Sequence, residues 1–269
     1  MTPVTSERRA VITDRIELPR VYMAWLSPSI YTQGDANADV AASALGGGKS
    51  SRLYRSLVYD KQIAQDVMAY QQSMMLTSAF MIEATARPGH TAQELEAAID
   101  EELARFRANG PEPDEIERAR NQAETQTVRG LERLGGFGGV ADRLNEYNHY
   151  LGDPGFLKKD LQRYQNVTPA MVKDFAAQLT ASSRVVVHGV PGRQELGPEV
   201  PKSGPPASAS GQKETVNADE PWRGTRPAAG AARPLVVPVP ASFRLDNGLT
   251  VLLNERPGVP VVSATLVLK

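Results

Sequence analysis

The sequence contains no cysteine, and this absence excludes disulfide bridges, thiolate catalysis and cysteine-bound zinc. It has no excess of either charge: the formal net charge is −1, which argues against nucleic acid or a membrane surface as a partner. It also has no apolar run long enough to span a bilayer, and no apolar segment near Met1 that would form a signal peptide. The compartment therefore stays open, and the periplasm is expected only if a parent protein is exported.

Hydrophobic residues make up 41% of the 269 residues, which is enough to bury a sizeable core. Apolar residues on both faces of residues 20–26 predict a central strand. The other segments with strand patterns are residues 11–18, 67–72, 78–86 and 184–190. The strands come in neighbouring pairs, two helical patterns lie between the first pair and the second, and four more are grouped between residues 91 and 179. This order predicts an α+β fold with a mostly antiparallel sheet and helices packed on it, rather than the regular βα alternation of a Rossmann-like fold.

Start and stop signals delimit the predicted helices. Thr91 and Glu94 match a capping box, and the helix that follows has a buried stripe and a natural stop at Gly110. The residues of this stripe are Leu95, Ile99, Leu103 and Phe106. Thr168 followed by Pro169 predicts the N-terminus of the last helix.

The glycine-rich link Gly46–Gly48 separates two helical patterns. Glycine is used where φ is positive or where a backbone approaches closely, so we expect a hinge and a second helix that starts at Ser50 or Ser51. Two interpretations follow from the residues alone: a pair of helix caps without a ligand, or a phosphate-binding P-loop, whose last three positions match the letters GKS. The P-loop pattern lacks its first glycine, because Ser43 stands there, and a helix rather than a strand leads into it.

Three stretches resemble one protein family. The letters LGGGKSSRLYRSLVYDKQIAQ and LNEYNHYLGDPGFLKKDLQRYQNVTPAMVKDFA are similar to the second-type domain of the pitrilysin/insulinase family of zinc metallopeptidases. The letters FRLDNGLTVLLNERPGVPVVSATLVLK are similar to the start of a first-type domain of that family. The resemblance covers roughly residues 11–190 and 242–269, and it implies a metallopeptidase domain like that of mitochondrial processing peptidase.

The composition predicts three parts. Residues 1–191 are expected to form the second-type domain, with its core from about residue 11 and a polar, frayed lead-in before it. Residues 192–241 are rich in Pro, Gly, Ser and Ala and are expected to be a linker. Residues 242–269 are expected to be the opening hairpin, about Asn247-Gly248, and the strand Val259–Leu268 of a truncated next domain.

The resemblance implies zinc on an inverted His-x-x-Glu-His motif in a first-type domain, where a zinc-bound water attacks the peptide and the Glu acts as general base. This chain does not carry the motif: its histidines, His90, His149 and His188, lie far apart. We therefore expect no metal ligand and no catalytic residue here, with zinc in the full-length protein or a partner. His90 is expected in a solvated turn, His149 on a helix surface and His188 in the core.

The family's substrate-holding residues are only partly matched. Some members use an Arg and a Tyr of a distal second-type domain; Val58 and Gln65 stand in their places, so that role is not carried over. The non-catalytic subunit of mitochondrial processing peptidase holds substrate with a longer glycine-rich loop before an SRLY-like helix. The similar places in this chain, which are the candidate substrate-binding residues, are Gly46, Gly47, Gly48, Lys49, Ser50 and Arg52. Because the loop here is shorter, a structural role competes with a binding role.

The resemblance and the missing motif together predict a non-catalytic domain of a pitrilysin-like zinc metalloendopeptidase. Such a domain would form part of the peptide chamber and support a zinc-bearing first-type domain, in cis or in trans. Its expected partners are that domain and a peptide substrate, and alone it is not expected to cleave peptides. The alternative is a catalytically inactive peptide-binding or assembly scaffold of the same fold.

Overall fold

The computed structural model describes residues 4–194, 230, 239–255 and 262–267. The chain divides into two compact units, Met1–Glu195 with Val259–Lys269, and Leu196–Gly258, and each is described by itself. The strands of the first unit are β1 (Arg8–Asp14), β2 (Arg20–Ser27), β3 (Ala64–Gln72), β4 (Ser78–Ala86) and β5 (Arg184–Pro191). Its longer helices are α1 (Asp35–Gly46), α2 (Ala92–Asn109), α3 (Pro113–Gly130), α4 (Val140–Leu151), α5 (Leu157–Gln165) and α6 (Pro169–Ala176).

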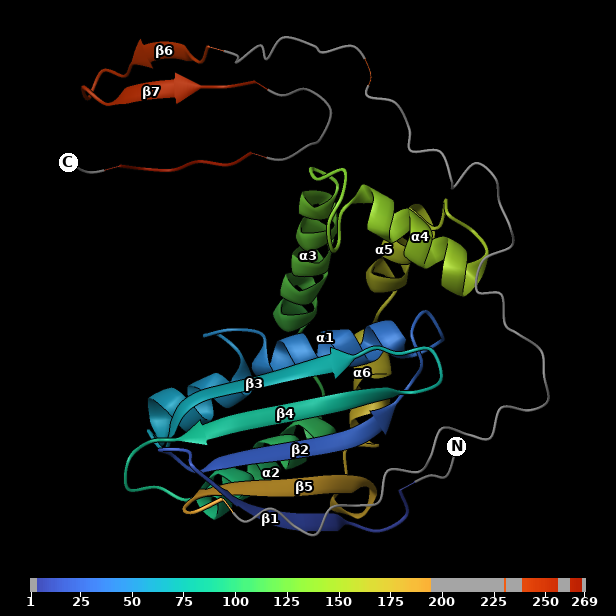
Figure 1. Cartoon of the computed structure of the whole chain (residues 1–269), viewed down its shortest axis with the longest axis vertical. Helices are drawn as coiled ribbons and strands as arrows, with labels where there is room; N and C mark the ends of the chain where they lie inside the picture. The colour runs from blue at the N-terminus through green and yellow to red at the C-terminus, as the bar shows by residue number, and fades with distance from the viewer. Residues whose placement is uncertain (1–3, 195–229, 231–238, 256–261, 268–269) are drawn as a thin grey trace. The chain divides into compact units, whose positions relative to one another are not determined.

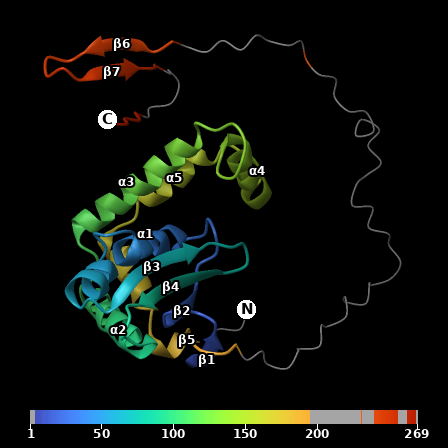
Figure 2. The ribbon, with the colours of Figure 1, turned by 60° about the vertical axis from the view of Figure 1, so that its left-hand side comes forward.

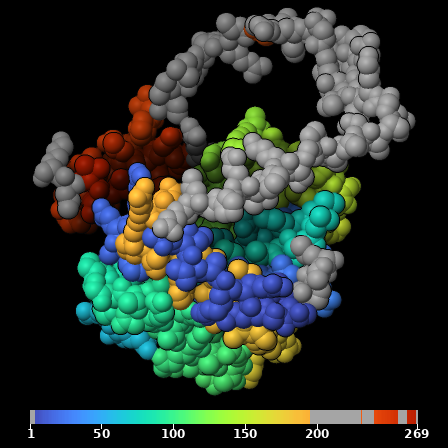
Figure 3. Space-filling model, turned by 60° about the horizontal axis from the view of Figure 1, so that its bottom comes forward, coloured from blue at the N-terminus to red at the C-terminus, as the bar shows by residue number. Residues whose placement is uncertain are grey.

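The five strands form one sheet in the order β1-β5-β2-β4-β3 (Figure 1). Every neighbouring pair is antiparallel except β1 and β5, and β2 lies in the middle, so the predicted fold class and the central strand are confirmed. The predicted lead-in is wrong at its end, because β1 begins at Arg8, which pairs with Val185. The strand predicted over residues 11–18 exists but is shifted, since β1 ends at Asp14. Its charged first residues did not indicate a strand, because an edge strand is largely exposed and need not alternate cleanly (Figure 3).

The core lies between the sheet and the helices α1, α2 and α6, which cover one of its faces (Figure 1). Alternate side chains of β2 and β4 point into it, including Met23, Phe80 and Ile82, all fully buried. The predicted stripe of α2 is confirmed, since its four members are at most 1% exposed. The capping box at Thr91 is also confirmed, and Gly110 ends the helix with a positive φ of 75°.

The other face of the sheet carries no helix of the described part of this unit (Figure 1). We call it the open sheet face and define it by Tyr22, Ala24, Met81, Val185 and Val187. These side chains are half-buried, whereas their neighbours along each strand point into the core. Cross-strand register places them side by side, so they form an apolar patch on this face. Polar side chains border the patch, because Glu83 pairs with Tyr22 and Tyr70 pairs with Met81.

Helices α3, α4 and α5 form an arm that extends beyond the sheet on the side of α1 (Figure 2). Helices α3 and α5 contact each other, and both contact α1. Thr168 caps α6 by accepting a hydrogen bond from the backbone N–H of Met171, and Pro169 is its first residue, as predicted. No helix within the described ranges is both long enough and apolar enough to cross a membrane.

The second unit contains an antiparallel hairpin of β6 (Ala241–Arg244) and β7 (Thr250–Leu253). Its turn includes Gly248, whose φ of 85° explains the Asn-Gly signal, so the predicted hairpin is confirmed. Most of the predicted linker, residues 192–241, lies outside the described residues. The predicted strand Val259–Leu268 is wrong where it can be compared, because residues 262–267 are not in a strand. An apolar, β-branched run forms a strand only with a neighbouring strand to pair with.

Candidate functional site

The glycine-rich link lies where the C-terminus of α1 meets β3. A Cβ on Gly46 would lie 2.1 Å from the backbone nitrogen of Ala69, so glycine is required for this close packing. A Cβ on Gly47 would lie 2.5 Å from the carbonyl oxygen of Ser43. Gly48 has a φ of 105°, a conformation that favours glycine. Each glycine therefore has a structural reason of its own.

The residues after the link lead into a helix close to the predicted start, but no serine side chain caps it. Lys49 and Ser50 are exposed, and Ser51 is buried with its hydroxyl donating back to the carbonyl of Gly48 at 2.6 Å. Helical structure starts at Arg52 and is π-helical over Tyr54–Asp60. Ser51 therefore stands at the start of the helix as predicted, and its carbonyl accepts from the Arg55 N–H, but its hydroxyl closes the glycine turn instead of capping the helix.

Arg52 is held inside the domain. Its guanidinium donates to both carboxylate oxygens of Glu115, at 2.8 and 2.7 Å, and to the carbonyl of Gly110 at 3.1 Å. It also lies over the ring of Phe106, 5.0 Å from the centroid. The hydrogen bonds from Arg52 to Glu115 raise the pKa of Arg52 above its ordinary value. This set of contacts ties the link to α2 and α3 and supports a structural role for Arg52.

A groove of about 270 Å³ opens beside the link, between α1, β3, α3 and α5. We call it the α1–β3 groove. Gly47 lines it, and so do three consecutive residues of β3, Ala69 to Gln71. Successive side chains of a strand point to opposite faces, so three in a row meet the groove only at the edge of the strand. From α3 come small alanines and the amides of Gln122 and Gln126.

Asp39 of α1 is the only carboxylic acid among the described residues that line this groove. The hydroxyl of Tyr164, from α5, donates to its Oδ2 at 2.7 Å. Burial, together with the nearby charge of Asp35, raises the pKa of Asp39 to about 7, although the hydrogen bond from Tyr164 lowers it. Asp39 therefore changes charge near neutral pH.

A buried polar cluster beneath the groove fastens the arm to α1. Arg163 pairs with Asp35 at 3.1 Å and with Asp160 at 2.7 Å, and Tyr147 donates to Asp160 at 2.7 Å. The side chain of Asp35 is only 2% exposed. Buried charges are costly unless they are paired, so this cluster fixes where α4 and α5 meet α1.

The sequence does not reveal this cluster or the groove, because 125 positions separate Asp39 from Tyr164. One local signal exists: Asp35 and Asp39 stand one turn apart on α1, among letters that are otherwise mostly small or apolar. Two carboxylates on the buried face of a helix indicate partners elsewhere in the chain.

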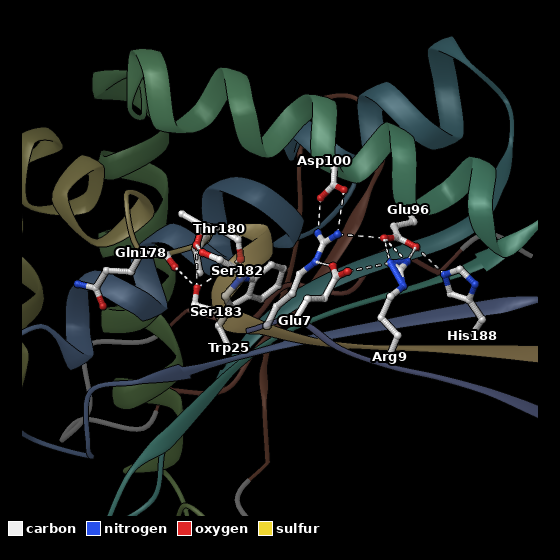
Figure 4. Close-up of polar contacts among 12 residues, drawn as sticks. Glu7, Arg9, Trp25, Glu96, Asp100, Gln178, Thr180, Ser182, Ser183 and His188 are labelled. Carbon is white, nitrogen blue, oxygen red and sulfur yellow. Dashed lines mark hydrogen bonds and ion pairs between the residues drawn. The ribbon is translucent and has the colours of Figure 1, made fainter. Parts of the chain in front are cut away.

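His188 is a buried partner of Glu96, as Figure 4 shows. Its Nε2 lies 2.7 Å from Oε2 of Glu96, and Arg9 and Arg184 also donate to that carboxylate. Burial opposes the charge of Glu96, but these hydrogen bonds and positive charges outweigh it and hold the pKa of Glu96 below its usual range. The expectation of a core position for His188 is confirmed, and the network fastens the edge strand β1 to α2.

The residues present do not fit a zinc ion. Within the described ranges, no three His, Asp or Glu side chains lie close enough together to hold a metal. His149 is exposed on α4, as expected, and packs against the ring of Tyr150. His90 lies in the turn before α2, 3.4 Å from Glu94, and is half-buried rather than fully solvated.

The two positions that would hold the family's Arg and Tyr lie apart from this groove. Val58 is 7% exposed and packs in the core. Gln65 is exposed and lines a separate hollow with Arg20 and Thr85.

The fold and the site define a class of protein: an α+β domain with one covered and one open sheet face, which offers a groove but, in its described residues, no ligand set for a metal. Residues 2–123 match the family model described as the peptidase M16 inactive domain. Pitrilysin and insulinase are M16 peptidases, and the resemblance is thereby confirmed.

Known proteins are similar to this chain in sequence or in fold. An uncharacterized zinc protease of Streptomyces coelicolor is 31% identical over 137 residues, which are 51% of this chain and 29% of that protein. A protease of Helicobacter pylori has a similar fold, with a TM-score of 0.64, 20% identity and coverage of 71% of this chain and 46% of that one. The peptidase M16 inactive domain from Pseudomonas fluorescens has a TM-score of 0.60 at 18% identity, over 71% and 45% of the two chains. The chain thus spans less than half the length of each of these relatives.

Proposed function

We propose that this chain supplies a non-catalytic wall of the peptide chamber in an M16 zinc metalloendopeptidase and supports a zinc-bearing domain that it does not itself contain. The observation that carries the proposal is the open sheet face. An antiparallel sheet commonly packs one face on the core and keeps the other polar, yet here the uncovered face carries an apolar patch at its centre. An exposed apolar surface of this kind indicates contact with another domain or with substrate.

The α1–β3 groove supports peptide binding at this wall. Strand β3 lies at the edge of the sheet, and an edge strand presents backbone groups to which an extended peptide can add. The amides of Gln122 and Gln126 on the opposite side can both donate to and accept from a peptide backbone. In this proposal Gly46, Gly47 and Gly48 shape the end of the groove, Lys49 and Ser50 are exposed beside it, and Arg52 holds the link in place.

The first test is a peptidase assay on an unstructured peptide, with and without added zinc. It compares this chain alone, a zinc-bearing M16 domain with the His-x-x-Glu-His motif alone, and their mixture. We expect cleavage that depends on the mixture, because the chain supplies a wall and the other domain supplies the metal. Absence of stimulation in the mixture would favour the scaffold alternative, and cleavage by this chain alone would contradict the proposal.

Two neighbouring substitutions on β4 test the open sheet face. Met81→Glu, on the open face, should change the free energy of unfolding by less than about 1 kcal/mol but reduce the stimulation seen in the mixture. Ile82→Glu, on the opposite face, buries a carboxylate in the core and should unfold the domain. Urea unfolding measures the first effect, and unchanged stimulation by a folded Met81→Glu variant would count against a functional open face.

A further inference from the structure

The α1–β3 groove has an uneven distribution of charge. Its described lining residues include one carboxylic acid, Asp39, and no Lys, Arg or His. The other polar groups are amides, hydroxyls and phenols, and the remaining walls are small and apolar. A groove lined in this way attracts a positive group and offers nothing to neutralise a negative one.

Asp39 has an oxygen available for a ligand. Tyr164 donates to Oδ2, and no described residue donates to Oδ1. The residue is half-buried and lies in the groove wall, so this oxygen is partly removed from water. A carboxylate oxygen in such a place binds an N–H donor more strongly when the donor carries charge.

We propose that Asp39 is a specificity residue that binds an ammonium group of the peptide in the α1–β3 groove. This inference rests on the proposed function, because it assigns the substrate class for the same groove. The ammonium can be a lysine side chain or a free N-terminus, which share this chemistry. The carboxylate accepts its hydrogen bond at Oδ1 while Tyr164 holds Oδ2, so the acid is oriented before the peptide arrives.

The surroundings of Asp39 favour a bound cation and make its binding depend on pH. Asp35 on the same helix and Asp160 on α5 add negative charge, and Arg163 is already shared between them. On β3 the only titratable group that faces the groove is Tyr70, and α3 contributes none. Because the pKa of Asp39 is about 7, its ionised fraction rises about tenfold between pH 6 and pH 8. Affinity for the ammonium group should rise with it.

Three peptides bound to the full chain test the proposal. All have the same alternating Ala-Ser sequence: one is acetylated and carries a central lysine, one is acetylated with norleucine in that place, and one has norleucine and a free N-terminus. We expect the lysine peptide, the free N-terminus peptide or both to bind about tenfold more tightly at pH 8 than the acetylated norleucine peptide. The advantage of the lysine peptide should shrink at pH 6. That of the free N-terminus should change less, because an α-amino group, with a pKa of about 7.7–8.0, loses part of its charge at pH 8. Calorimetry or fluorescence anisotropy measures each dissociation constant.

Two variants make the result specific. Asp39→Asn keeps an acceptor for Tyr164 but removes the charge, so it should abolish both the preference and its pH dependence. Asp174→Asn, on the exposed surface of α6, removes one charge away from the groove and should preserve both. Equal binding of all three peptides to the native chain would overturn the ammonium site and leave peptide binding standing. Binding of none of them would overturn the groove as a peptide site, and this inference with it.

Discussion

Replacing Gly46 by alanine is expected to lower the free energy of unfolding by about 3 kcal/mol. The new methyl group would lie 2.1 Å from the backbone nitrogen of Ala69 and 2.7 Å from its Cβ, far inside the usual contact distance. Alanine stabilises a helix by only about 1 kcal/mol relative to glycine, so the clash outweighs the gain. Urea unfolding of the variant, followed by circular dichroism, measures the change.

Gly135 provides the matched control for this prediction. No described atom lies within 4 Å of a Cβ built there, and its φ is not in the left-handed region. Gly135→Ala should therefore change stability by no more than about 0.5 kcal/mol. A Gly46→Ala protein as stable as the Gly135→Ala protein would show that α1 and β3 are not packed as closely as described.

Replacing Asp39 by asparagine is expected to stabilise the protein at pH 8 by up to about 4 kcal/mol and to have little effect near pH 4. The pKa of Asp39 is about 7 in the folded protein, against 3.8 as its ordinary value, mainly because burial disfavours the charged form. Between these two values the folded protein binds more protons than the unfolded chain. The free energy of unfolding therefore falls as pH rises from about 4 to 7, and asparagine removes this loss.

The measurement is the difference in unfolding free energy between the Asp39→Asn variant and the native protein at pH 5 and pH 8. A difference that grows with pH supports a carboxyl held neutral by burial. The Asp174→Asn variant controls for the loss of any aspartate and should show a difference that is the same at both pH values. A constant difference for Asp39→Asn as well would mean that this carboxyl titrates normally.

The local elements of this fold were predictable because their signals are local. The capping box at Thr91 and the Asn-Gly turn before Leu249 act through backbone groups only a few residues away. Apolar residues alternate along β2 and β4 and form a stripe on α2, and these patterns predict which face of each element is buried. They do not predict which element packs against that face. The fold class was predicted, but of this sheet's strands that follow one another in the chain only β3 and β4 form a hairpin, since β1 pairs with β5 and β2 lies between β5 and β4.

Three details were predicted wrongly: the bounds of β1, the hydrogen bond of Ser51 and the strand at residues 262–267. β1 contains Arg8 and Arg9 and is a strand because β5, far along the sequence, pairs with it and Glu96 binds Arg9. The hydroxyl of Ser51 could cap a helix or close a turn, and only the glycine turn before it decided which. Residues 262–267 are mostly apolar and have a high strand propensity, but they do not form a strand.

The sequence by itself determined the fold class, the family resemblance and the absence of the zinc motif, since each depends on residue types in a fixed order along the chain. The tertiary structure alone decided what the candidate residues do. It placed Gly46 against β3, tied Arg52 to Glu115, and brought Asp39 and Tyr164 together across 125 positions beside an edge strand. A groove is made by the approach of distant segments, and burial there sets the pKa of Asp39. Neither is a property of any stretch of sequence read alone.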